Sequence, residues 1–284
     1  MITLKSYAKI NISLDLVGKR DDGYHLLRTV MQTVSLCDYI TLSRARKDGI
    51  NMTCNRPYIP TDEKNIAYKT ALKFFEYTGI TPAANIGLRK YIPCGAGLGG
   101  GSSNGAAVFD GLCTLFGVDI PIKKKVEVTK DIGADIPFFF YGGTALCEGI
   151  GEIVTPLKNL PDCRIIIAKP PVSLSTAAIF SSPKTKEAFG GTSTDGVLFG
   201  IEKGDIKSVT QSAKNALEGA SIDECSQIAD IKESLLQNGA DFSMMSGSGS
   251  AVFGIFTDYK KAKRAFYSLS QNYKEVYITK PTQF

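Results

Sequence analysis

A glycine-rich stretch in the middle of the chain has the composition of a loop that binds phosphate. Residues 93–104 read PCGAGLGGGSSN, with five glycines in twelve positions. Glycines leave backbone N–H groups accessible, and a helix N-terminus carries a partial positive charge, so such a loop leading into a helix suits an anion. We predict that the phosphate-binding residues are Pro93, Cys94, Gly95, Ala96, Gly97, Leu98, Gly99, Gly100, Gly101, Ser102 and Ser103.

The flanks of this loop predict regular structure. Ile86 and Leu88 alternate with polar residues before it, which indicates a strand. Residues 106–116 carry apolar side chains at three- and four-residue intervals, which indicates a helix. We expect Ser102, Ser103 or Asn104 to cap this helix and Gly117 to end it. A flexible glycine linker would lack such flanks.

Two familiar phosphate loops fit the stretch poorly. The P-loop pattern requires a lysine just before the hydroxyl residue, and no lysine lies between Lys90 and Lys123. Gly95, Gly97 and Gly100 match the dinucleotide pattern G-x-G-x-x-G. However, the acid expected about 20 residues later would be Asp119, at the end of a helix rather than of a strand.

Lys9 and Asp135 are candidates for a pair of opposite charges in a cleft. Residues 4–17 alternate apolar and polar side chains, which predicts a half-buried strand with Lys9 and Asn11 on the face away from the core. Asp135 lies among apolar residues before Pro137, which disfavours helix at Ile136. Asp135 is either a helix cap or a carboxylate held in a cleft by a cation such as Lys9, and Lys9 alone could equally be an exposed strand lysine.

The chain has one histidine, His25, which follows Tyr24 after a charged turn. A single histidine excludes histidine metal clusters, and it allows a Ser-His-Asp hydrolase only through His25. An ordinary surface pair is the alternative for Tyr24 and His25.

Composition describes a soluble globular protein. The 284 residues are 43% hydrophobic and 21% charged, enough for one large or two ordinary domains. Neither a membrane span nor a signal peptide is evident, and seven cysteines without a C-x-x-C pair argue for reduced thiols and a cytoplasmic location. The net charge of +5 is spread along the chain, and Lys123-Lys124-Lys125 is interpreted as a helix surface. We expect neither a nucleic-acid nor a membrane partner.

The order of elements predicts an α+β protein. A helix is expected over 65–77, a hairpin over 144–157 and helices near 175–181, 205–218 and 224–238. Strands over 165–167, 251–256 and 275–279 and a helix from Asp258 suggest an α+β plait in the C-terminal part. We place a domain boundary near Asn159, giving domains 1–158 and 159–284.

Three motifs, in this order and spacing, resemble the GHMP kinase superfamily. They are A-K-I-N at 8–11, the glycine loop at 93–104, and S-G-S-G at 246–249. The stretch from Lys9 to His25, with D-G-Y-H at 22–25, and the run G-A-D-I-P-F-F at 133–139 resemble a narrower branch. Its members phosphorylate a methylerythritol that carries cytidine diphosphate, in non-mevalonate isoprenoid biosynthesis.

The resemblance, which covers essentially the whole chain, implies a two-domain GHMP kinase fold. Residues 1–158 would resemble ribosomal protein S5 domain 2, and residues 159–284 would be ferredoxin-like. ATP would donate its γ-phosphoryl group to the 2-hydroxyl of the acceptor. The protein would be a monomer or a homodimer.

The resemblance also implies roles for individual residues. Asp135 would be the catalytic aspartate with Lys9 beside it, Asn11 would contact the acceptor, and the glycine loop would hold the phosphates of ATP. The remaining implied residues are Tyr24, His25 and Phe180 around cytosine, Asn65 and Ile66 near adenine, and Ser103 as a candidate Mg²⁺ ligand.

Other functions remain open at this point. A GHMP kinase acting on mevalonate, homoserine or a sugar is one alternative, although such acceptors carry no base for Tyr24 and His25 to bind. A catalytically silent nucleotide-binding module is another, and the presence of Lys9 and Asp135 argues against it. A dinucleotide oxidoreductase is the most distant.

Overall fold

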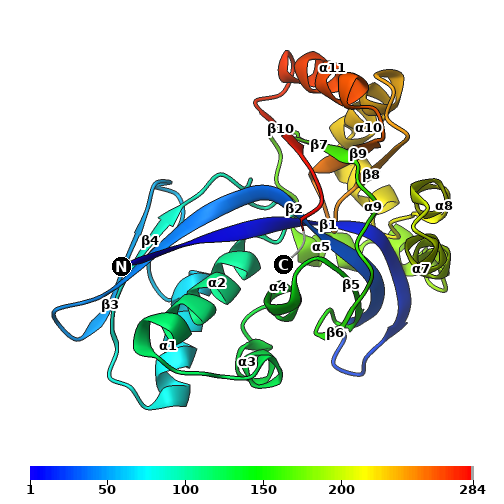
Figure 1. Ribbon diagram of the computed structural model, residues 1–284. Helices are drawn as coiled ribbons and strands as arrows, with labels where there is room; N and C mark the ends of the chain where they lie inside the picture. The colour runs from blue at the N-terminus through cyan, green and yellow to red at the C-terminus, as the bar shows by residue number, and fades with distance from the viewer. Residues whose placement is uncertain (283–284) are drawn as a thin grey trace. The chain divides into compact units, whose positions relative to one another are not determined.

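Two long strands, β1 (Ile2–Lys19) and β2 (His25–Arg44), form a hairpin at the start of the chain. The computed structural model describes residues 1–282 and divides into two units, and both strands contribute to each unit (Figure 1). Unit 1 contains residues 1–8, 37–92 and 99–141; unit 2 contains residues 9–36, 93–98 and 142 onwards. The boundary between residues 158 and 159 stays a prediction from the sequence.

Unit 1 packs helices against one face of a sheet. Its β4 pairs antiparallel with β2 and parallel with β3, and apolar residues of these strands share a core with α1 and α2. Phe74 of α1 meets Phe109 of α2 edge to face, with 5.6 Å between ring centroids. Beyond its parts of β1 and β2, the elements are β3 (Gly49–Cys54), α1 (Ile66–Thr78), β4 (Ala83–Arg89), α2 (Gly100–Phe116), α3 (Ile122–Thr129) and α4 (Ile136–Tyr141).

The helix predicted over 65–77 is confirmed as α1, whose N-cap is Asn65 and whose stop is Gly79. Gly117, with φ +70°, ends α2 as predicted. The predicted cap of α2 is wrong, because Gly99 in a left-handed conformation is the N-cap and Gly100 already begins the helix. Ser102, Ser103 and Asn104 therefore lie inside the helix, beyond the capping position.

Unit 2 contains a second sheet, in the order β10-β7-β9-β8, with every pairing antiparallel. Helices α10 and α11 pack on it and share one apolar core with Ile166, Ala168 and Val252. This order is that of a ferredoxin-like plait, as predicted. The elements are β5 (Thr144–Gly149), β6 (Ile153–Pro156), β7 (Arg164–Lys169), α5 (Thr176–Ser181), α6 (Pro183–Glu187), α7 (Ser193–Lys203), α8 (Ile206–Ser212), α9 (Glu218–Glu224), α10 (Gln227–Gln237), β8 (Phe242–Met245), β9 (Val252–Phe256), α11 (Tyr259–Ser270) and β10 (Glu275–Thr279).

The helix predicted over 205–218 is interrupted. Helix α8 ends at Ser212, and the chain then runs alongside β1, where Leu14 N donates to Lys214 O and Ala216 N donates to Leu14 O, both at 2.9 Å. Pairing with a neighbouring strand satisfies these backbone groups as well as a helix would, and local propensity cannot reveal it. The sequence also gave no signal for α6, α7 or β8.

The polar face of β1 is buried, contrary to the prediction that Lys9 and Asn11 point away from the core. In unit 2, Lys9, Asn11, Ser13 and Asp15 are each at most 4% exposed. These side chains have hydrogen-bond partners; Asn11 Nδ2, for example, donates to Thr29 Oγ1 at 2.9 Å. The alternation of apolar and polar residues correctly predicted the strand. It does not predict that other segments cover the polar face of that strand.

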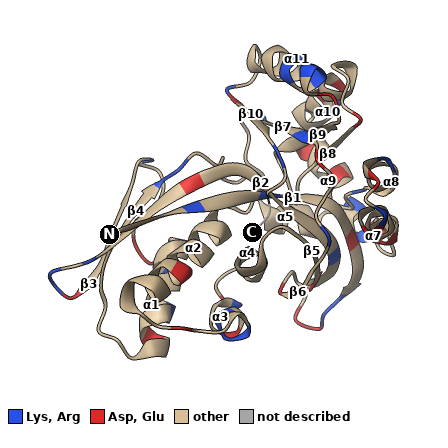
Figure 2. Cartoon of the chain, viewed as in Figure 1, with Lys and Arg blue, Asp and Glu red and all other residues tan. Residues whose placement is uncertain are grey.

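The basic run Lys123–Lys125 lies on α3, where the ribbon of Figure 2 is coloured blue for Lys and Arg. Lys124 pairs with Glu127 at 2.9 Å, and Lys125 pairs with Asp110 at 2.6 Å. The run is therefore a helix surface with local ion pairs, as interpreted from the sequence. None of the helices in residues 1–282 has the length and apolar character that a membrane span requires.

Candidate active site

The three sequence motifs meet through hydrogen bonds within unit 2. Lys9 N donates to Leu98 O at 3.0 Å, which joins the first strand to the glycine loop. Ser246 Oγ donates to Gly97 O at 2.9 Å, and Asn11 N donates to Ser246 Oγ at 3.3 Å. A-K-I-N, the first half of the loop and S-G-S-G therefore form one cluster, although they are far apart in the sequence.

Glycine is required at two positions of this cluster. Gly97 has φ +73°, and a Cβ there would lie 2.0 Å from Ser246 O. Gly247 has φ +57°, and a Cβ there would lie 3.3 Å from Lys9 Nζ. A side chain at Gly97 would push the motifs apart. A side chain at Gly247 would strain the backbone and crowd the ends of the Lys9 and Asn11 side chains.

The side chain of Lys9 is held in a fixed direction. Its Nζ donates to Asn11 Oδ1 at 2.6 Å, and the other end of the Asn11 amide donates to Thr29 Oγ1 at 2.9 Å. Because the amide is bound at both ends, its carbonyl can only face the ammonium. A positive charge is thus positioned next to the residues 97–98.

One hydrogen bond and one close approach describe the rest of the loop in unit 2. Ala251 N donates to Ala96 O at 3.2 Å. Gly95 has φ +59°, and a Cβ there would lie 3.1 Å from the side chain of Ser173. Roles for Pro93 and Cys94, which precede these residues, stay predictions.

The second half of the loop belongs to unit 1 and forms the start of α2. Gly99 has φ +66°, and Ser103 N donates to Gly99 O at 2.9 Å. The N–H groups of Gly100, Gly101 and Ser102 lie in the first turn, where a helix supplies no acceptor. The first turn carries no acidic side chain, so these donors and the helix dipole can bind an anion.

Asp135 lies in the turn directly before α4, in unit 1. Ile136 N donates to Gly133 O at 3.0 Å, and a Cβ at Gly133 would lie 3.4 Å from Ser102 Oγ. The turn that carries Asp135 is therefore next to the first turn of α2. Ile136 is helical despite preceding Pro137, because proline is tolerated in the first helical turn.

Asn65 and Ile66, predicted near adenine, lie at the start of α1. Asn65 Oδ1 accepts from Ala67 N at 2.9 Å, and its amide donates to Pro60 O at 2.7 Å. Ile66 contacts the loop, since a Cβ at Gly101 would lie 3.2 Å from its Cδ1. The contact of both residues with adenine stays a prediction.

His25 is the first residue of β2 and lies among aromatic rings of unit 2. Its ring centroid is 5.2 Å from that of Phe180, which was predicted, and 5.5 Å from that of Phe189, which was not. Tyr24 beside it is 61% exposed. Burial, and secondly the charge of Lys19, lower the pKa of His25, so its neutral ring offers one donor and one acceptor.

Comparison with known proteins identifies the family. The family model for the GHMP kinases N terminal domain matches residues 65–143, and that for the GHMP kinases C terminal matches residues 200–275. A 4-diphosphocytidyl-2-C-methyl-D-erythritol kinase from Clostridium botulinum is 42% identical over 97% of this chain and 98% of its own length. The chain belongs to the 4-diphosphocytidyl-2-C-methyl-D-erythritol kinase family of GHMP kinases.

Solved structures agree with this family. A crystal structure of a 4-(cytidine 5'-diphospho)-2C-methyl-D-erythritol kinase matches with a TM-score of 0.85, at 28% identity and complete coverage of both chains. A homoserine kinase from Cytophaga hutchinsonii matches with a TM-score of 0.79 at 21% identity, covering 98% of this chain and 94% of that one, which shows the shared fold. The chain is thus a phosphotransferase with an alcohol group as acceptor.

Sequence reasoning missed a buried ion pair in unit 1 of this GHMP kinase. Asp38 is fully buried and accepts from Lys90 Nζ, from Asn104 Nδ2 at 2.9 Å and from Ile92 N at 2.8 Å. Lys90 Nζ also donates to Asn104 Oδ1 at 2.8 Å. The pair connects β2 to the start of α2. Asp38 lies inside β2, and Lys90 directly follows β4.

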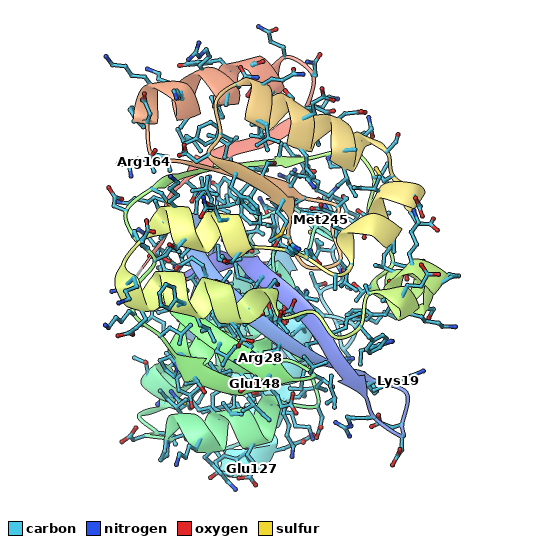
Figure 3. All side chains as sticks on the ribbon, turned by 90° about the vertical axis from the view of Figure 1, so that its right-hand side faces the viewer. Lys19, Arg28, Glu127, Glu148, Arg164 and Met245 are labelled. Carbon is cyan, nitrogen blue, oxygen red and sulfur yellow. The ribbon has the colours of Figure 1, made fainter. Side chains whose placement is uncertain are left out.

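Sequence reasoning also missed the support of the S-G-S-G motif. Asn215 Nδ2 donates to Met245 O at 2.9 Å and to Gly247 O at 2.8 Å. Glu218 Oε2 accepts from Met245 N at 2.8 Å, and Figure 3 labels Met245 at this position. The signal was hidden because Asn215 fell inside the wrongly predicted helix over 205–218.

Ser103, predicted as a metal ligand, is 3% exposed, and its hydroxyl lies 2.7 Å from that of Ser6. Within residues 1–282, no group of three or more His, Cys, Asp and Glu side chains could hold a metal ion. The residues thus fit a metal that arrives on the phosphates of a nucleotide, since Mg²⁺ often keeps several waters and few protein ligands.

Proposed function

We propose that this protein transfers the γ-phosphoryl group of ATP to the 2-hydroxyl of 4-diphosphocytidyl-2-C-methyl-D-erythritol, a step of non-mevalonate isoprenoid precursor biosynthesis. The observation that carries the proposal is the position of His25. His25, the one histidine of the chain, lies on the hairpin that also bears Lys9 and Asn11. Its ring contacts the rings of Phe180 and Phe189. A neutral imidazole among aromatic rings suits a flat base with polar edges.

ATP binds, in this proposal, with its phosphates on the glycine loop. The N–H groups at the start of α2 are the donors, and the bare backbone at Gly95, Gly97 and Gly99 admits the phosphate oxygens. Asn65 and Ile66 would lie toward the adenine end, which the contact between Ile66 and Gly101 supports.

Asp135 and Lys9 act on the acceptor and the transferred group. The 2-hydroxyl oxygen forms a bond to the γ-phosphorus as the bond to the bridging oxygen of ADP breaks, and the hydroxyl proton passes to Asp135. A carboxylate is a weak base toward an alcohol, so Asp135 mainly orients the hydroxyl and accepts the proton late, in a loose transition state. Lys9, directed by Asn11, stabilises charge on the phosphoryl oxygens, and Asn11 contacts the acceptor.

Mg²⁺ is expected to arrive with ATP and to neutralise part of the phosphate charge. The hydroxyl of Ser103, near the start of α2, is the candidate protein ligand of the metal. Its partner Ser6 also accepts from Asn104 Nδ2 at 2.8 Å. This leaves a lone pair of Ser103 for a metal.

The proposal is tested by ATP consumption with four acceptors: the cytidyl substrate, mevalonate, homoserine and galactose. We expect turnover with the cytidyl substrate and little with the other three. Faster turnover with one of the other three would show that the proposed acceptor is wrong. ATP binding without turnover on any acceptor would favour a catalytically silent nucleotide-binding module.

Replacing His25 tests the recognition of the base. We predict that His25→Ala raises the KM for the cytidyl substrate about tenfold or more while the KM for ATP stays within about twofold, because a lost polar contact to a base costs roughly 1–3 kcal/mol. Steady-state kinetics with each substrate varied in turn measures both constants. Equal losses for both substrates would contradict the assignment.

A further inference from the structure

Phe189 is a second phenylalanine against the histidine, and it lies outside every motif that identifies the family. Its ring centroid is 5.5 Å from that of His25, with 30° between the ring planes. Phe180 makes a similar contact at 5.2 Å and 31°. Phe189 remains 37% exposed, so part of its ring stays open to a ligand.

The backbone around Phe189 is fixed to β1, the strand that also carries Lys9 and Asn11. Phe189 forms a β-bridge with Leu16, and Gly190 N donates to Leu16 O at 3.0 Å. A Cβ at Gly191 would lie 2.7 Å from Asp15 Oδ1, so the glycine allows the chain to pass close over that carboxylate. Backbone pairing with β1 therefore fixes the point from which the Phe189 side chain extends.

The chain after Phe189 is held as well. Asp15 is 3% exposed, and its carboxylate accepts from Ser193 Oγ at 2.6 Å and from Thr194 N at 2.8 Å, at the start of α7. Thr194 Oγ1 donates to Arg28 O at 3.0 Å, which ties the same point to β2. Arg28 also pairs with Glu148 at 3.5 Å, and Figure 3 shows these two side chains beside one another. The segment has the rigidity that a recognition residue needs.

We propose that Phe189 is a specificity-determining residue of the acceptor site, whose ring, together with that of Phe180, orients the His25 imidazole toward the polar edge of cytosine. The proposal rests on the proposed function. Ring contacts of this kind restrict rotation of the imidazole, so its donor and its acceptor keep fixed directions.

The test uses Phe189→Ala, Phe189→Leu and Phe189→Tyr, with Phe199→Ala as the matched control. Leucine retains apolar volume without a ring, and tyrosine restores the ring. Phe199 lies in the same unit and is 61% exposed, whereas the ring contacts of His25 within residues 1–282 are with Phe180 and Phe189. It therefore reports what loss of a surface phenylalanine does by itself.

The first readout is the NMR titration of the imidazole, which needs no assignment because the chain has one histidine. Burial and Lys19 lower the pKa of His25, so removing the ring of Phe189 should raise that pKa toward its ordinary value. We expect the shift in Phe189→Ala and not in Phe199→Ala. An unchanged pKa of His25 in Phe189→Ala would contradict a contact between the two rings in solution.

The second readout is binding and kinetics. Cytidine 5'-diphosphate should perturb the His25 resonance of the unsubstituted protein, and Phe189→Ala should weaken this binding and raise the KM for the cytidyl substrate roughly tenfold, as loss of an aromatic contact to a base does. The KM for ATP should stay unchanged, Phe189→Leu should resemble alanine, and Phe189→Tyr should restore the normal values.

Two failures are distinguishable. If cytidine 5'-diphosphate perturbs His25 but Phe189→Ala and Phe189→Leu bind it normally, the role of Phe189 is overturned and the proposed function stands. If cytidine 5'-diphosphate leaves His25 unperturbed in the unsubstituted protein, the proposed function falls, and the role of Phe189 falls with it.

Discussion

Lys9 shows how a single residue is prepared for its proposed role. An ammonium group at 4% exposure would be costly without hydrogen-bond acceptors, and the Asn11 carbonyl at 2.6 Å supplies one. The resemblance of the sequence motifs predicts Lys9, Asn11 and Asp135 as site residues. The burial of Lys9 was not predictable, because the segments 97–98 and 246–247 that cover it are remote in the sequence.

Asp135 is the residue whose replacement is most informative. We predict that Asp135→Asn lowers kcat by about 10²–10⁴-fold, since the amide cannot accept the hydroxyl proton, while ATP binding measured by calorimetry is retained. Asp131→Asn is the matched control, because Asp131 is exposed in the preceding turn. Near-normal turnover in Asp135→Asn would remove it from the mechanism.

Among the elements, the glycine loop and the start of α2 depend on close backbone approach. Sequence composition predicted a phosphate loop, yet it could not tell which glycines are needed for conformation and which for space. Gly97 needs both, since its φ is +73° and Ser246 O occupies the place of a side chain. Gly117 needs only the conformation, with φ +70° and no atom within 4 Å of a Cβ.

This contrast gives a prediction for a matched pair of substitutions. Gly117→Ala should cost roughly 1–2 kcal/mol of stability from the left-handed backbone alone and leave the KM for ATP unchanged. Gly97→Ala should cost more and also raise the KM for ATP, because the loop must move away from Ser246. Denaturant unfolding and kinetics measure both effects, and equal behaviour of the two variants would contradict this reading.

The buried pair of Asp38 and Lys90 supports the same element. Lys90→Met should destabilise the protein by about 3–5 kcal/mol, because it leaves the buried Asp38 carboxylate without its ammonium partner. The double variant Asp38→Asn with Lys90→Met should recover part of this loss. Denaturant unfolding of the unsubstituted protein, of each single variant and of the double variant gives the coupling free energy. A double variant no more stable than Lys90→Met would show that charge compensation is not the cause.

At the scale of the whole molecule, the glycine loop contains one of the points where the chain passes from one unit to the other. Residues 93–98 belong to unit 2, and residues 99–141 belong to unit 1. Most regular elements, the α+β class and the ferredoxin-like plait were predictable from periodicity and motifs. The extended run after Ser212 and the segment with Phe189 were not, because pairing with β1 determines both.

The central claim is that the protein is an alcohol kinase that uses cytidine diphosphate as a handle on its acceptor. The most direct measurement compares kcat/KM for 4-diphosphocytidyl-2-C-methyl-D-erythritol with that for the same methylerythritol phosphate without cytidine. We predict phosphorylation of the complete substrate with a kcat/KM at least about a hundredfold higher, because binding energy from the remote base is used at the reacting hydroxyl. Equal values for the two acceptors, or no phosphorylated product from either, would contradict the account.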